Sequence, residues 1–345
     1  VLIMSNYLSR IVGVSVAING TGTYGGGTSN GLSSSIHQFR NTTPVAIDTT
    51  VVNLQELRSS FSKTSDAVGR QLYKLTPGLV LMGAGSAAIV QASGTVAADF
   101  RLGKILRMCG MSESITAVTS SLTYTFRSSG FEDGIVDCHL LDTSGTNSLK
   151  YKMKGVYGTA VFAGSAGQVI TVDPTLTGLI LAQPSTTASV GAVFPSAGNT
   201  AQTMKAEGLS LTAGGVTYSG ATGLKFKSFS LDLGIDVQED SDANAVDSLY
   251  GLLIAGRTPT LQLTVGCDST AINSLHADLL SGAIETIIFV HGSGVGKMCK
   301  FTCYGQLQSI TQTDDTGLRT LQLQYNLAIG TGADESELKI ELGSF

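Results

Sequence analysis

The chain has 345 residues, of which 42% are hydrophobic and only 14% are charged. This length allows one large domain or two ordinary ones. The formal net charge of −5 and the scattered Lys and Arg residues exclude a basic footprint for gripping nucleic acid, and the lack of Trp argues against a base-stacking platform. So low a charge fraction favours a subunit whose surface is largely covered by copies of itself.

Cysteine usage and the first residues indicate a protein made in a reducing cytoplasm. The five cysteines form an odd, irregular set, so free buried thiols are expected rather than a disulfide framework. They are Cys109, Cys138, Cys267, Cys299 and Cys303. The opening residues, VLIMSNYLSR, have no basic n-region and no small-residue cleavage site, so no signal peptide is expected. No apolar run approaches the roughly 20 residues of a membrane helix, and no membrane partner is expected.

Residues 1–48 are predicted to form an N-terminal arm. A short strand pattern from Ile11 to Ile18 is followed by NGTGTYGGGTSNGLSSS, a stretch that cannot nucleate a helix. From residue 49 onward the chain is typical of strands. Period-two alternation of apolar and polar residues is clearest in three segments: TVVNLQEL (50–57), FKSFSLDLGIDV (226–237) and TLQLTVG (260–266).

Few segments have helical spacing. In 97–110 an apolar stripe formed by Ala98, Leu102, Ile105, Leu106 and Cys109 ends at Gly110. In 269–282 a similar stripe is formed by Ile272, Leu275, Leu279 and Leu280, with Ser269 or Thr270 as N-cap and Gly282 as C-cap. Segment 247–256, DSLYGLLIAG, is a candidate third helix.

An internal repeat is the most informative pattern. LKYKMKG (149–155) matches CKFTCYG (299–305) at an offset of 150 (299 − 149). Each segment then runs through a glycine turn, GSAG (164–167) or DDTG (314–317), into a long return strand. In those strands, Ile170, Val172, Leu176 and Gly178 match Leu321, Leu323, Leu327 and Ile329 at an offset of 151.

The elements around this hairpin recur in the same order: strand, strand, helix, strand, hairpin and strand. A strand upstream of each helix ends in Thr-Val, at Thr95-Val96 and Thr264-Val265. Segment 114–130 is interpreted as an insertion in the first copy. Matching order across the flanking elements indicates a duplication.

The predicted fold is mainly β: two tandem β-sandwich or open-barrel domains, each with one flanking short α-helix, and an extended N-terminal arm. The predicted boundaries are the arm at 1–48, a first copy at 49–182, a Ser/Thr/Gly/Pro-rich linker at 183–203, a second copy at 204–332 and a C-terminal tail at 333–345.

Two glycine-rich segments match nucleotide-binding loops only by letter. After Gly20-x-Gly22-x-x-Gly25 come Gly, Gly, Thr and Ser where the dinucleotide fingerprint needs a helix start, so a flexible arm is the stronger interpretation. In HGSGVGKM, His291 replaces the leading glycine and Met298 stands where Ser or Thr must hold magnesium, so this segment is interpreted as a hairpin tip.

Two acidic motifs are also weak. Asp315-Thr316-Gly317 has the spelling of an aspartic protease, but the equivalent turn at 164–167 lacks an Asp that a two-carboxylate enzyme would need. Asp240-x-Asp242-x-Asn244 begins like a calcium loop without the turn glycine or the bidentate Glu. A solvated or subunit-facing acidic loop at 238–248 is the stronger interpretation, with an incidental ion as the alternative.

The histidines and cysteines are interpreted as structural. The four histidines, His37, His139, His276 and His291, have no Cys, Asp or Glu at metal-ligand spacing. Cys299 and Cys303 would lie about 13 Å apart on one strand face, at ~3.3 Å per residue, which is too far for a disulfide or a shared metal. No nucleophile has an identifiable base, so no catalytic residue, cofactor or metal site is predicted.

Two long segments resemble the tail tube (major tail) proteins of long-tailed bacteriophages. GKILRMCGMSESITAVTSSLTYTFRSSGF (103–131) is similar to that family's short helix with a Leu-Leu-Arg-x-Cys-Gly-like end, Thr-Tyr strand and Ser-Ser-Gly-Phe turn. Segment 228–265 is similar to the family's Ser-Phe-x-Leu-Asp-x-Gly strand, acidic loop and Arg-x-Pro-Thr turn. The long arm and 183–203 depart from the family pattern.

The resemblance implies a virion structural protein that self-assembles into stacked rings, a conduit for genome ejection. One sheet of each domain would join its neighbours edge to edge, which removes exposed strand edges. Two domains per chain favour a trimeric ring with pseudo-sixfold symmetry, with a hexameric ring as the alternative. Other tail proteins at the tube ends, and the tape measure protein and phage DNA in the lumen, are the implied partners. An acidic conduit would repel the DNA phosphates. The arm, the acidic loop and the hairpin tips are candidates for ring-to-ring contacts.

Two other classes of function remain as alternatives. A duplicated β-sandwich receptor-binding or adhesion module of a virion would favour exposed Trp or Tyr clusters and calcium loops, and the chain has no Trp. No pattern in the chain supports an enzyme.

Overall fold

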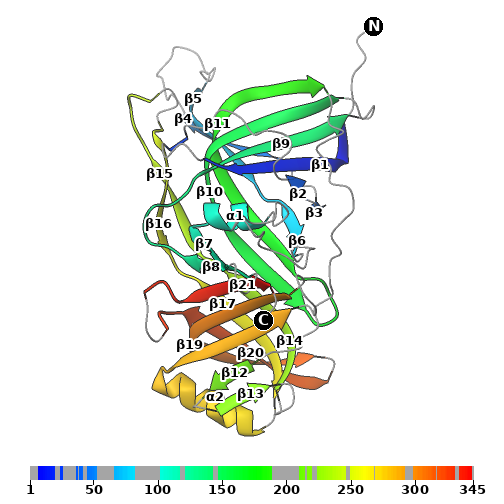
Figure 1. Ribbon diagram of the computed structural model, residues 1–345, viewed down its shortest axis with the longest axis vertical. Coiled ribbons are helices and arrows are strands. Elements are labelled where there is room, and N and C mark those ends of the chain that lie inside the picture. Colours follow the sequence, from blue (N-terminus) through cyan, green and yellow to red (C-terminus); the bar gives the residue numbers. More distant parts are fainter. Residues whose placement is uncertain are drawn as a thin grey trace, which may run out of the picture.

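The chain forms a mainly β structure with two short helices and a large antiparallel sheet (Figure 1). The computed structural model describes residues 7–19, 24–25, 36–37, 39–41, 45–52, 66–81, 102–116, 121–142, 147–188, 210–213, 216–219, 224–245, 249–267, 269–291, 298–315, 317–330 and 334–343. The strands are built from the alternating apolar and polar residues that fit a half-buried pleated surface.

The elements divide along the chain into a first half, up to β11, and a second half, from β12. The first half contains β1 (Tyr7–Ile18), β2 (Ile36–His37), β3 (Phe39–Asn41), β4 (Ala46–Val52), β5 (Ala67–Leu75), β6 (Gly78–Val80), α1 (Leu102–Met108), β7 (Met111–Thr116), β8 (Ser121–Phe126), β9 (Gly134–Asp142), β10 (Asn147–Ser165) and β11 (Thr171–Ala188). The second half contains β12 (Ser210–Ala213), β13 (Val216–Ser219), β14 (Leu224–Asp232), β15 (Ile235–Asp240), β16 (Gly251–Arg257), β17 (Thr260–Cys267), α2 (Ser269–Ser281), β18 (Ile284–His291), β19 (Met298–Asp315), β20 (Leu318–Leu327) and β21 (Leu338–Gly343).

Both main helices are confirmed, and a glycine ends each of them. Gly110 follows α1 with φ 74°, and Gly282 follows α2 with φ 67°, in the left-handed region that glycine adopts most easily. Residues 97–101 of the first predicted helix lie outside the described part. In α2 the predicted stripe is wrong at one position, because Leu280 is 88% exposed and Asp278 is buried beside Leu275 instead.

Two predictions about strands need correction. The predicted third helix at 247–256 is wrong, since Gly251–Arg257 is strand β16, paired with β15. A short apolar run fits a buried strand as well as a helix. The predicted strand 226–237 is divided into β14 and β15 because the chain turns at Gly234, which has φ 58°. Strand 260–266 is confirmed within β17, and β4 confirms the start of 50–57. Residues 53–57 and the strand ending at Thr95-Val96 lie outside the described residues.

The buried Asp278 belongs to a small polar cluster in the core of the second half. The Tyr325 hydroxyl donates a hydrogen bond to Glu285 Oε2 at 2.9 Å. Burial raises the pKa of Glu285 to about 8, and the nearby Asp278 carboxylate adds to this rise, while the Tyr325 hydrogen bond opposes it. The folded protein therefore holds a proton on Glu285 that the unfolded chain releases near its ordinary pKa of 4.5.

We expect E285Q to remove a pH dependence of stability. Because the pKa of Glu285 is higher in the folded state, its contribution to stability is fully present below about pH 4.5 and is lost as the pH rises through about 8. The difference in free energy of unfolding between the wild-type chain and E285Q, measured by urea denaturation, should fall by roughly 2–4 kcal/mol between pH 5 and pH 8.5. The difference between the wild-type chain and D334N, a change at an exposed carboxylate, should stay constant over the same range. Equal slopes for wild type and E285Q would show that Glu285 does not titrate in this range.

The two halves have a largely similar order of strand partners, except that β5 pairs with the return strand β11 whereas β16 pairs only with β15. In the first half β1 pairs with β2 and β9, β9 with β10, β10 with β11, β11 with β5 and β6, β6 with β3, and β5 with β4. In the second half β12 pairs with β13 and β18, β18 with β19, β19 with β20, β20 with β17, β17 with β14, and β16 with β15. Along the chain, α1 follows β6, which pairs with the return strand β11. In the same way, α2 follows β17, which pairs with the return strand β20.

Irregularities of register recur at matching places. The β3–β6 ladder shifts between Phe39 and Asn41, and the β14–β17 ladder shifts between Phe226 and Ser228. The β4–β5 ladder shifts immediately before Val51, as the β15–β16 ladder does before Val237. Bulges of this kind are local features of a ladder that need not coincide in unrelated sheets.

The return strands do not follow the predicted offset of 151. Tyr157 pairs with Thr177, and its counterpart Leu307 pairs with Tyr325, so the ladder sets an offset of 148 (325 − 177) there. Further along, Val172 and Leu321 occupy equivalent places at an offset of 149 (321 − 172). The shift comes from bulges in β10 and β19 and from a shorter turn before β20, which sequence similarity does not reveal.

Three segments predicted to lie outside the domains contain sheet strands. Within the predicted arm, β1 pairs with β9 along the main sheet. Residues 183–188 of the predicted linker belong to β11, and 189–203 lie outside the described residues. The predicted C-terminal tail contains β21, which pairs with β19 and with β8. In β21, Leu338, Ile340 and Leu342 are buried, and the residues between them are polar. The strand is too short for this period-two pattern to be recognised in the sequence.

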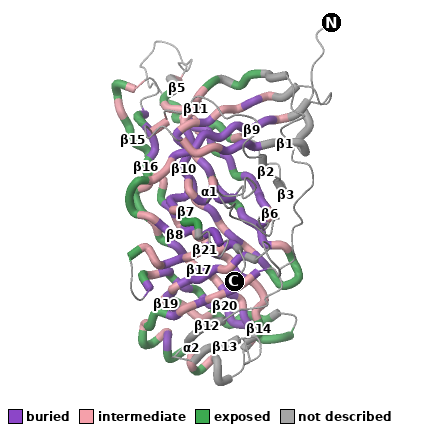
Figure 2. The backbone as a smooth tube through the Cα atoms, in the orientation of Figure 1, coloured by how far each residue is buried: buried purple, intermediate pink, exposed green. Residues whose placement is uncertain are grey.

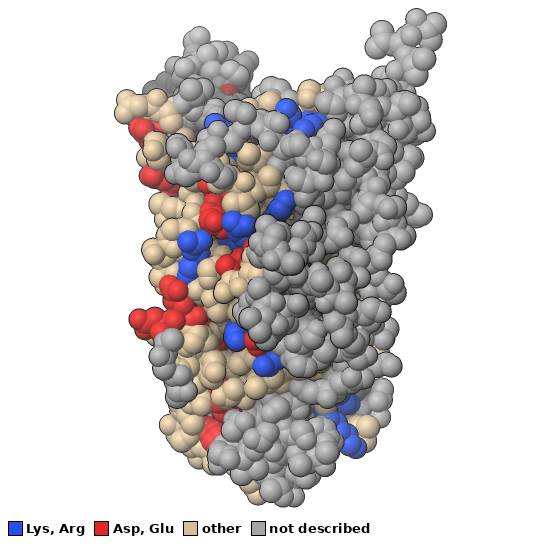
Figure 3. All heavy atoms as spheres, in the orientation of Figure 1, with Lys and Arg blue, Asp and Glu red and all other residues tan. Residues whose placement is uncertain are grey.

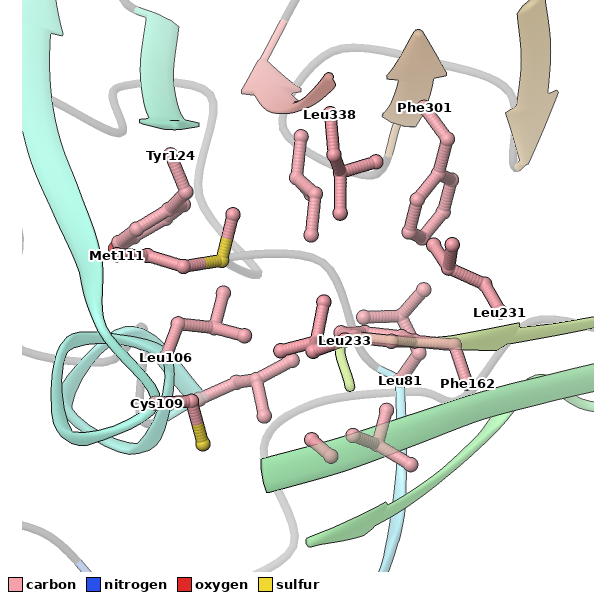
Figure 4. Close-up of a cluster of buried hydrophobic side chains, with 14 of the residues drawn as sticks. Leu81, Leu106, Cys109, Met111, Tyr124, Phe162, Leu231, Leu233, Phe301 and Leu338 are labelled. Atoms are coloured by element: carbon pink, nitrogen blue, oxygen red, sulfur yellow. The ribbon is translucent and has the colours of Figure 1, made fainter. Parts of the chain in front are cut away.

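The main hydrophobic core spans both halves, so the predicted domain boundaries do not separate two cores. Buried side chains from β1 through β21 form one contiguous cluster (Figure 2). Figure 4 shows side chains of the first half, such as Leu106, Tyr124 and Phe162, in one cluster with others from the second half, such as Leu231 and Phe301. The hairpin β7–β8, which overlaps the segment interpreted as an insertion, joins the halves through its ladder with β21.

Candidate functional surface

The motifs singled out in the sequence are turns or lie partly outside the described residues. Residues 20–23 and 292–297 are not described. His291 and Met298 end and begin the two paired strands of a hairpin, as predicted. Gly317 has φ 84° and its N–H donates to Asp314 Oδ1 at 2.7 Å, which confirms a turn between β19 and β20.

The surroundings of the acidic loop, of the buried cysteines and of His139 fit structural roles. Asp242 Oδ1 accepts hydrogen bonds from the backbone N–H of Asn244 at 2.9 Å and from its side chain at 3.1 Å. Cys299 and Cys303 are buried, as are Cys109 and Cys138. Burial and the nearby Lys150 and Lys152 lower the pKa of His139 to about 4. Within the described residues no group of three or more His, Cys, Asp or Glu could hold a metal ion.

The two halves of the chain meet at a junction between two strands. The distal part of β10 pairs with β14 from Val161↔Asp232 to Ser165↔Ser228. At its ends, the Leu233 N–H donates to the Ala160 carbonyl at 3.0 Å and the Ala166 N–H donates to the Lys227 carbonyl at 2.8 Å. The ladder therefore continues the sheet of the first half directly into that of the second.

The hairpin β15–β16 completes this junction by packing across the first half. Leu249 and Leu252 of the second half are buried in one cluster with Leu72 and Tyr157 of the first. Val237 and Ile254 are partly buried against the same cluster. Figure 1 shows β15 and β16 running along the side of the long strand β10. An ion pair between Arg70 on β5 and Glu239 on β15 lies at the same contact.

Tyr24 holds the hairpin against β10 by its hydroxyl. The hydroxyl donates to the Gly155 carbonyl at 2.9 Å and accepts from the Leu252 N–H at 2.7 Å. A Cβ atom at Gly155 would lie 2.5 Å from the Tyr24 oxygen, and one at Gly251 would lie 2.4 Å from the ring. The two glycines therefore allow the close approach on which both hydrogen bonds depend.

We expect Y24F to lower the free energy of unfolding by about 1–3 kcal/mol, because it leaves a partly buried N–H and a carbonyl without their partner. Amide hydrogen exchange at Leu252 should become faster, while exchange in the β10–β11 hairpin stays slow. Y250F, which alters a tyrosine that is 65% exposed, is the matched control. Unchanged exchange at Leu252 would contradict this role of Tyr24.

A cavity of about 230 Å³ lies where the hairpin meets the end of α1 and the turn after β8. Its lining includes Arg127 and Arg257, and both guanidinium groups bind other groups of the same chain. Arg257 binds Glu337 at 2.9 Å and lies 4.9 Å from the centre of the Phe126 ring, and Arg127 donates to the Ser129 carbonyl at 3.0 Å. These contacts fix the turn after β8 and the base of the hairpin in place.

Among the described strands, the edge of β19 beyond Gln306 and the outer edges of β3 and β4 have no partner strand. Beyond Gln306, β19 pairs only with β20, and the side chains of Thr311, Gln312, Thr313 and Asp314 are exposed. At the other end of the chain, β3 pairs only with β6 and β4 only with β5. Strand β4 exposes two apolar side chains, Ile47 at 54% and Val51 at 55%. Open edges with exposed apolar residues are typical of surfaces that another chain covers.

On the face shown in Figure 3, Lys and Arg lie in small dispersed groups among acidic and uncharged residues. Neither helix in the described part of the chain is long and apolar enough to cross a bilayer.

No family model matches the chain, and no curated protein is similar to it. The resemblance implied sheet edges that join neighbouring subunits but did not identify the strands, and the exposure of Ile47 and Val51 was not predicted from the sequence. The sequence contains only a faint sign that the β4–β5 and β15–β16 hairpins are equivalent. Phe39 precedes Val51 by 12 residues (51 − 39), and Phe226 precedes Val237 by 11 (237 − 226). The residue types between them differ too much for the similarity to stand out.

Proposed function

We propose that this chain is the structural subunit of a bacteriophage tail tube, built from a duplicated tube domain. The observation that carries the proposal is the largely similar order of strand partners in the two halves, together with register shifts at matching places. A gene duplication accounts for both features, and they extend the residue-level resemblance of 103–131 and 228–265 to tail tube proteins.

In this proposal three chains close into a ring with pseudo-sixfold symmetry, and the rings stack into a tube in the virion. The junction between β10 and β14 supports a ring, because it joins one copy of the domain to the other edge to edge. Repetition of a contact by rotation closes a ring and covers the open edges. A hexameric ring of single domains would leave this internal junction without a role.

The tube would serve as a passage for the genome without binding it by sequence. The net charge of −5 and the dispersed basic residues favour weak repulsion of phosphate over retention. Tape measure protein and DNA would occupy the lumen in turn, and other tail proteins would cap the ends. The acidic loop 238–248 and the hairpin tips are the proposed contacts between stacked rings.

Negative-stain electron microscopy of the purified, concentrated chain tests the proposal. Rings with a central hole, or tubes made of such rings, are the expected result. Discrete single-chain particles at every concentration would contradict it and favour a receptor-binding module.

A further inference from the structure

A lysine and an aspartate are buried together in the sheet of the first half. Lys150 Nζ on β10 lies 2.5 Å from Asp137 Oδ2 on β9. The Asp137 side chain is fully buried, and the Lys150 side chain is only 8% exposed. The other carboxyl oxygen, Asp137 Oδ1, has no hydrogen-bond partner within the described part of the chain. The lysine nitrogen is therefore held against a carboxyl group that is shielded from water.

The strand register places this pair on the face of the sheet that points away from the hydrophobic core. Cys138, next to Asp137 on β9, belongs to the core. Successive residues of a strand point to opposite faces, so Asp137 and His139 share the other face. In the β9–β10 ladder Lys152 is paired with Asp137, and Lys150 with His139. Lys150 thus reaches Asp137 across the diagonal of the ladder, a separation that long side chains span.

Burial makes the charged form of this pair costly. It raises the pKa of Asp137 above its ordinary value, while the nearby Lys150 and Lys152 oppose the rise. Two charges taken out of water regain their lost hydration only where additional hydrogen bonds satisfy the remaining donors and acceptors. Asp137 Oδ1 lacks such a bond among the described residues. A reaction that removed both charges would therefore relieve a cost that the fold now bears.

We propose that Lys150 and Asp137 condense into an amide bond that cross-links β9 to β10. Transfer of a proton from the ammonium to the carboxylate first gives a neutral amine and a neutral carboxylic acid. The amine nitrogen then forms a bond to Cγ of Asp137, and the bond from Cγ to the hydroxyl oxygen breaks. The hydroxyl leaves as water with a proton from the nitrogen. The products are one amide and one water, so no oxidant, reductant or further reactant is needed.

The geometry of the fold supplies what this condensation requires. Reacting atoms held about 3–3.5 Å apart need no further encounter, which removes much of the barrier. A nitrogen 2.5 Å from Asp137 Oδ2 is close to the carbon that bears this oxygen. The exclusion of water from the site also opposes hydrolysis of the amide once it has formed.

The second half contains the lysine of this pair without its acid, and it provides an internal control. Lys300 on β19 corresponds to Lys150 at the offset of 150 (300 − 150). Ile288 on β18 occupies the place that Asp137 has in the first ladder. Lys300 Nζ instead lies 3.2 Å from Glu341 Oε2, and the Lys300 side chain is 29% exposed. Water stabilises the charges there, so Lys300 is not expected to condense.

Intact mass spectrometry of the denatured, reduced full chain tests the cross-link. The wild-type chain should be lighter than its sequence by one water, about 18 Da. K150R keeps the positive charge but replaces the amine by a guanidinium group, so it should have the full mass of its sequence. K300R, the matched control at the equivalent lysine, should keep the loss. A wild-type chain with the full mass of its sequence would overturn the proposal.

Trypsin digestion of the wild-type chain locates the lost water, and it decides the question alone if K150R fails to fold. An amide on Lys150 blocks cleavage after this residue, so the peptide 128–152 should appear intact and lighter by one water. Backbone breaks between 137 and 150 should release no fragments from it. Cyclisation of Asp133 onto Gly134 also releases water, but it leaves cleavage after Lys150 normal, and that result would contradict the cross-link.

The cross-link and the tail tube are tested separately. The bond forms within one chain and does not depend on assembly. Rings made of chains with the full sequence mass would overturn the cross-link and leave the tube proposal standing. Single chains that lack one water, with trypsin blocked after Lys150, would support the cross-link and contradict the tube.

Discussion

Replacement of Phe301 by alanine should lower the free energy of unfolding by about 3–5 kcal/mol. Phe301 is fully buried at the point where the two halves meet. Its ring lies 5.5 Å from that of Phe162 in the first half, and 4.7 Å and 6.1 Å from those of Phe289 and Phe229 in the second. Removal of the ring leaves a cavity bordered by three aromatic side chains from separate strands, which cannot all move to fill it.

Urea denaturation followed by both tyrosine fluorescence and circular dichroism measures this effect. Because the core is continuous across the halves, the two signals should shift together to a lower urea concentration. L318A, which truncates a side chain that is 66% exposed, should change stability by less than about 0.5 kcal/mol. Separate transitions for F301A would instead indicate two halves that unfold independently.

Replacement of Gly234 by alanine should cost about 2–4 kcal/mol, the second large effect. Gly234 has φ 58° at the corner between β14 and β15, where a side chain is disfavoured. A Cβ atom there would also lie 2.1 Å from the Thr258 carbonyl oxygen, which is backbone and cannot rotate away. The Thr258 N–H donates to the Gly234 carbonyl at 2.9 Å, so relief of the clash would strain the turn into β17.

Thermal denaturation of G234A and the control G256A distinguishes this account of the corner from a general effect of replacing glycine. A Cβ atom at Gly256, on β16, would meet nothing within 4 Å. G256A should therefore keep the wild-type midpoint within a few degrees, and G234A should fall well below it. Since Gly234 sets the angle at which the hairpin leaves the sheet, G234A should also weaken ring assembly. Equal midpoints for the two variants would contradict the clash.

The predictable features of this fold are those encoded by local sequence. Gly110 and Gly282 mark the ends of both helices because glycine adopts the left-handed backbone at little cost. The alternation in 260–266 predicts β17 because one face of the strand is buried. By contrast, the seven residues of β16 contain too few polar positions to distinguish a strand from a helix. The strand β21 is short and lies far along the chain from the strands that pair with it.

The open strand edges could not be predicted from local sequence, for a different reason. Whether an edge is open depends on which strands pair, and β10 and β19 have similar sequences but different neighbours at their distal ends. Phe162 is buried in the internal junction, while its counterpart Gln312 is exposed and polar. The exposed edge of β19 is thus more polar than the internal junction between β10 and β14.

Cryo-electron microscopy of assembled rings, viewed end on, is the most direct measurement of the central claim. Three chains per ring, with six lobes of similar strand arrangement around a central hole, are the expected density. A ring of six complete chains, or an assembly without a central hole, would contradict it.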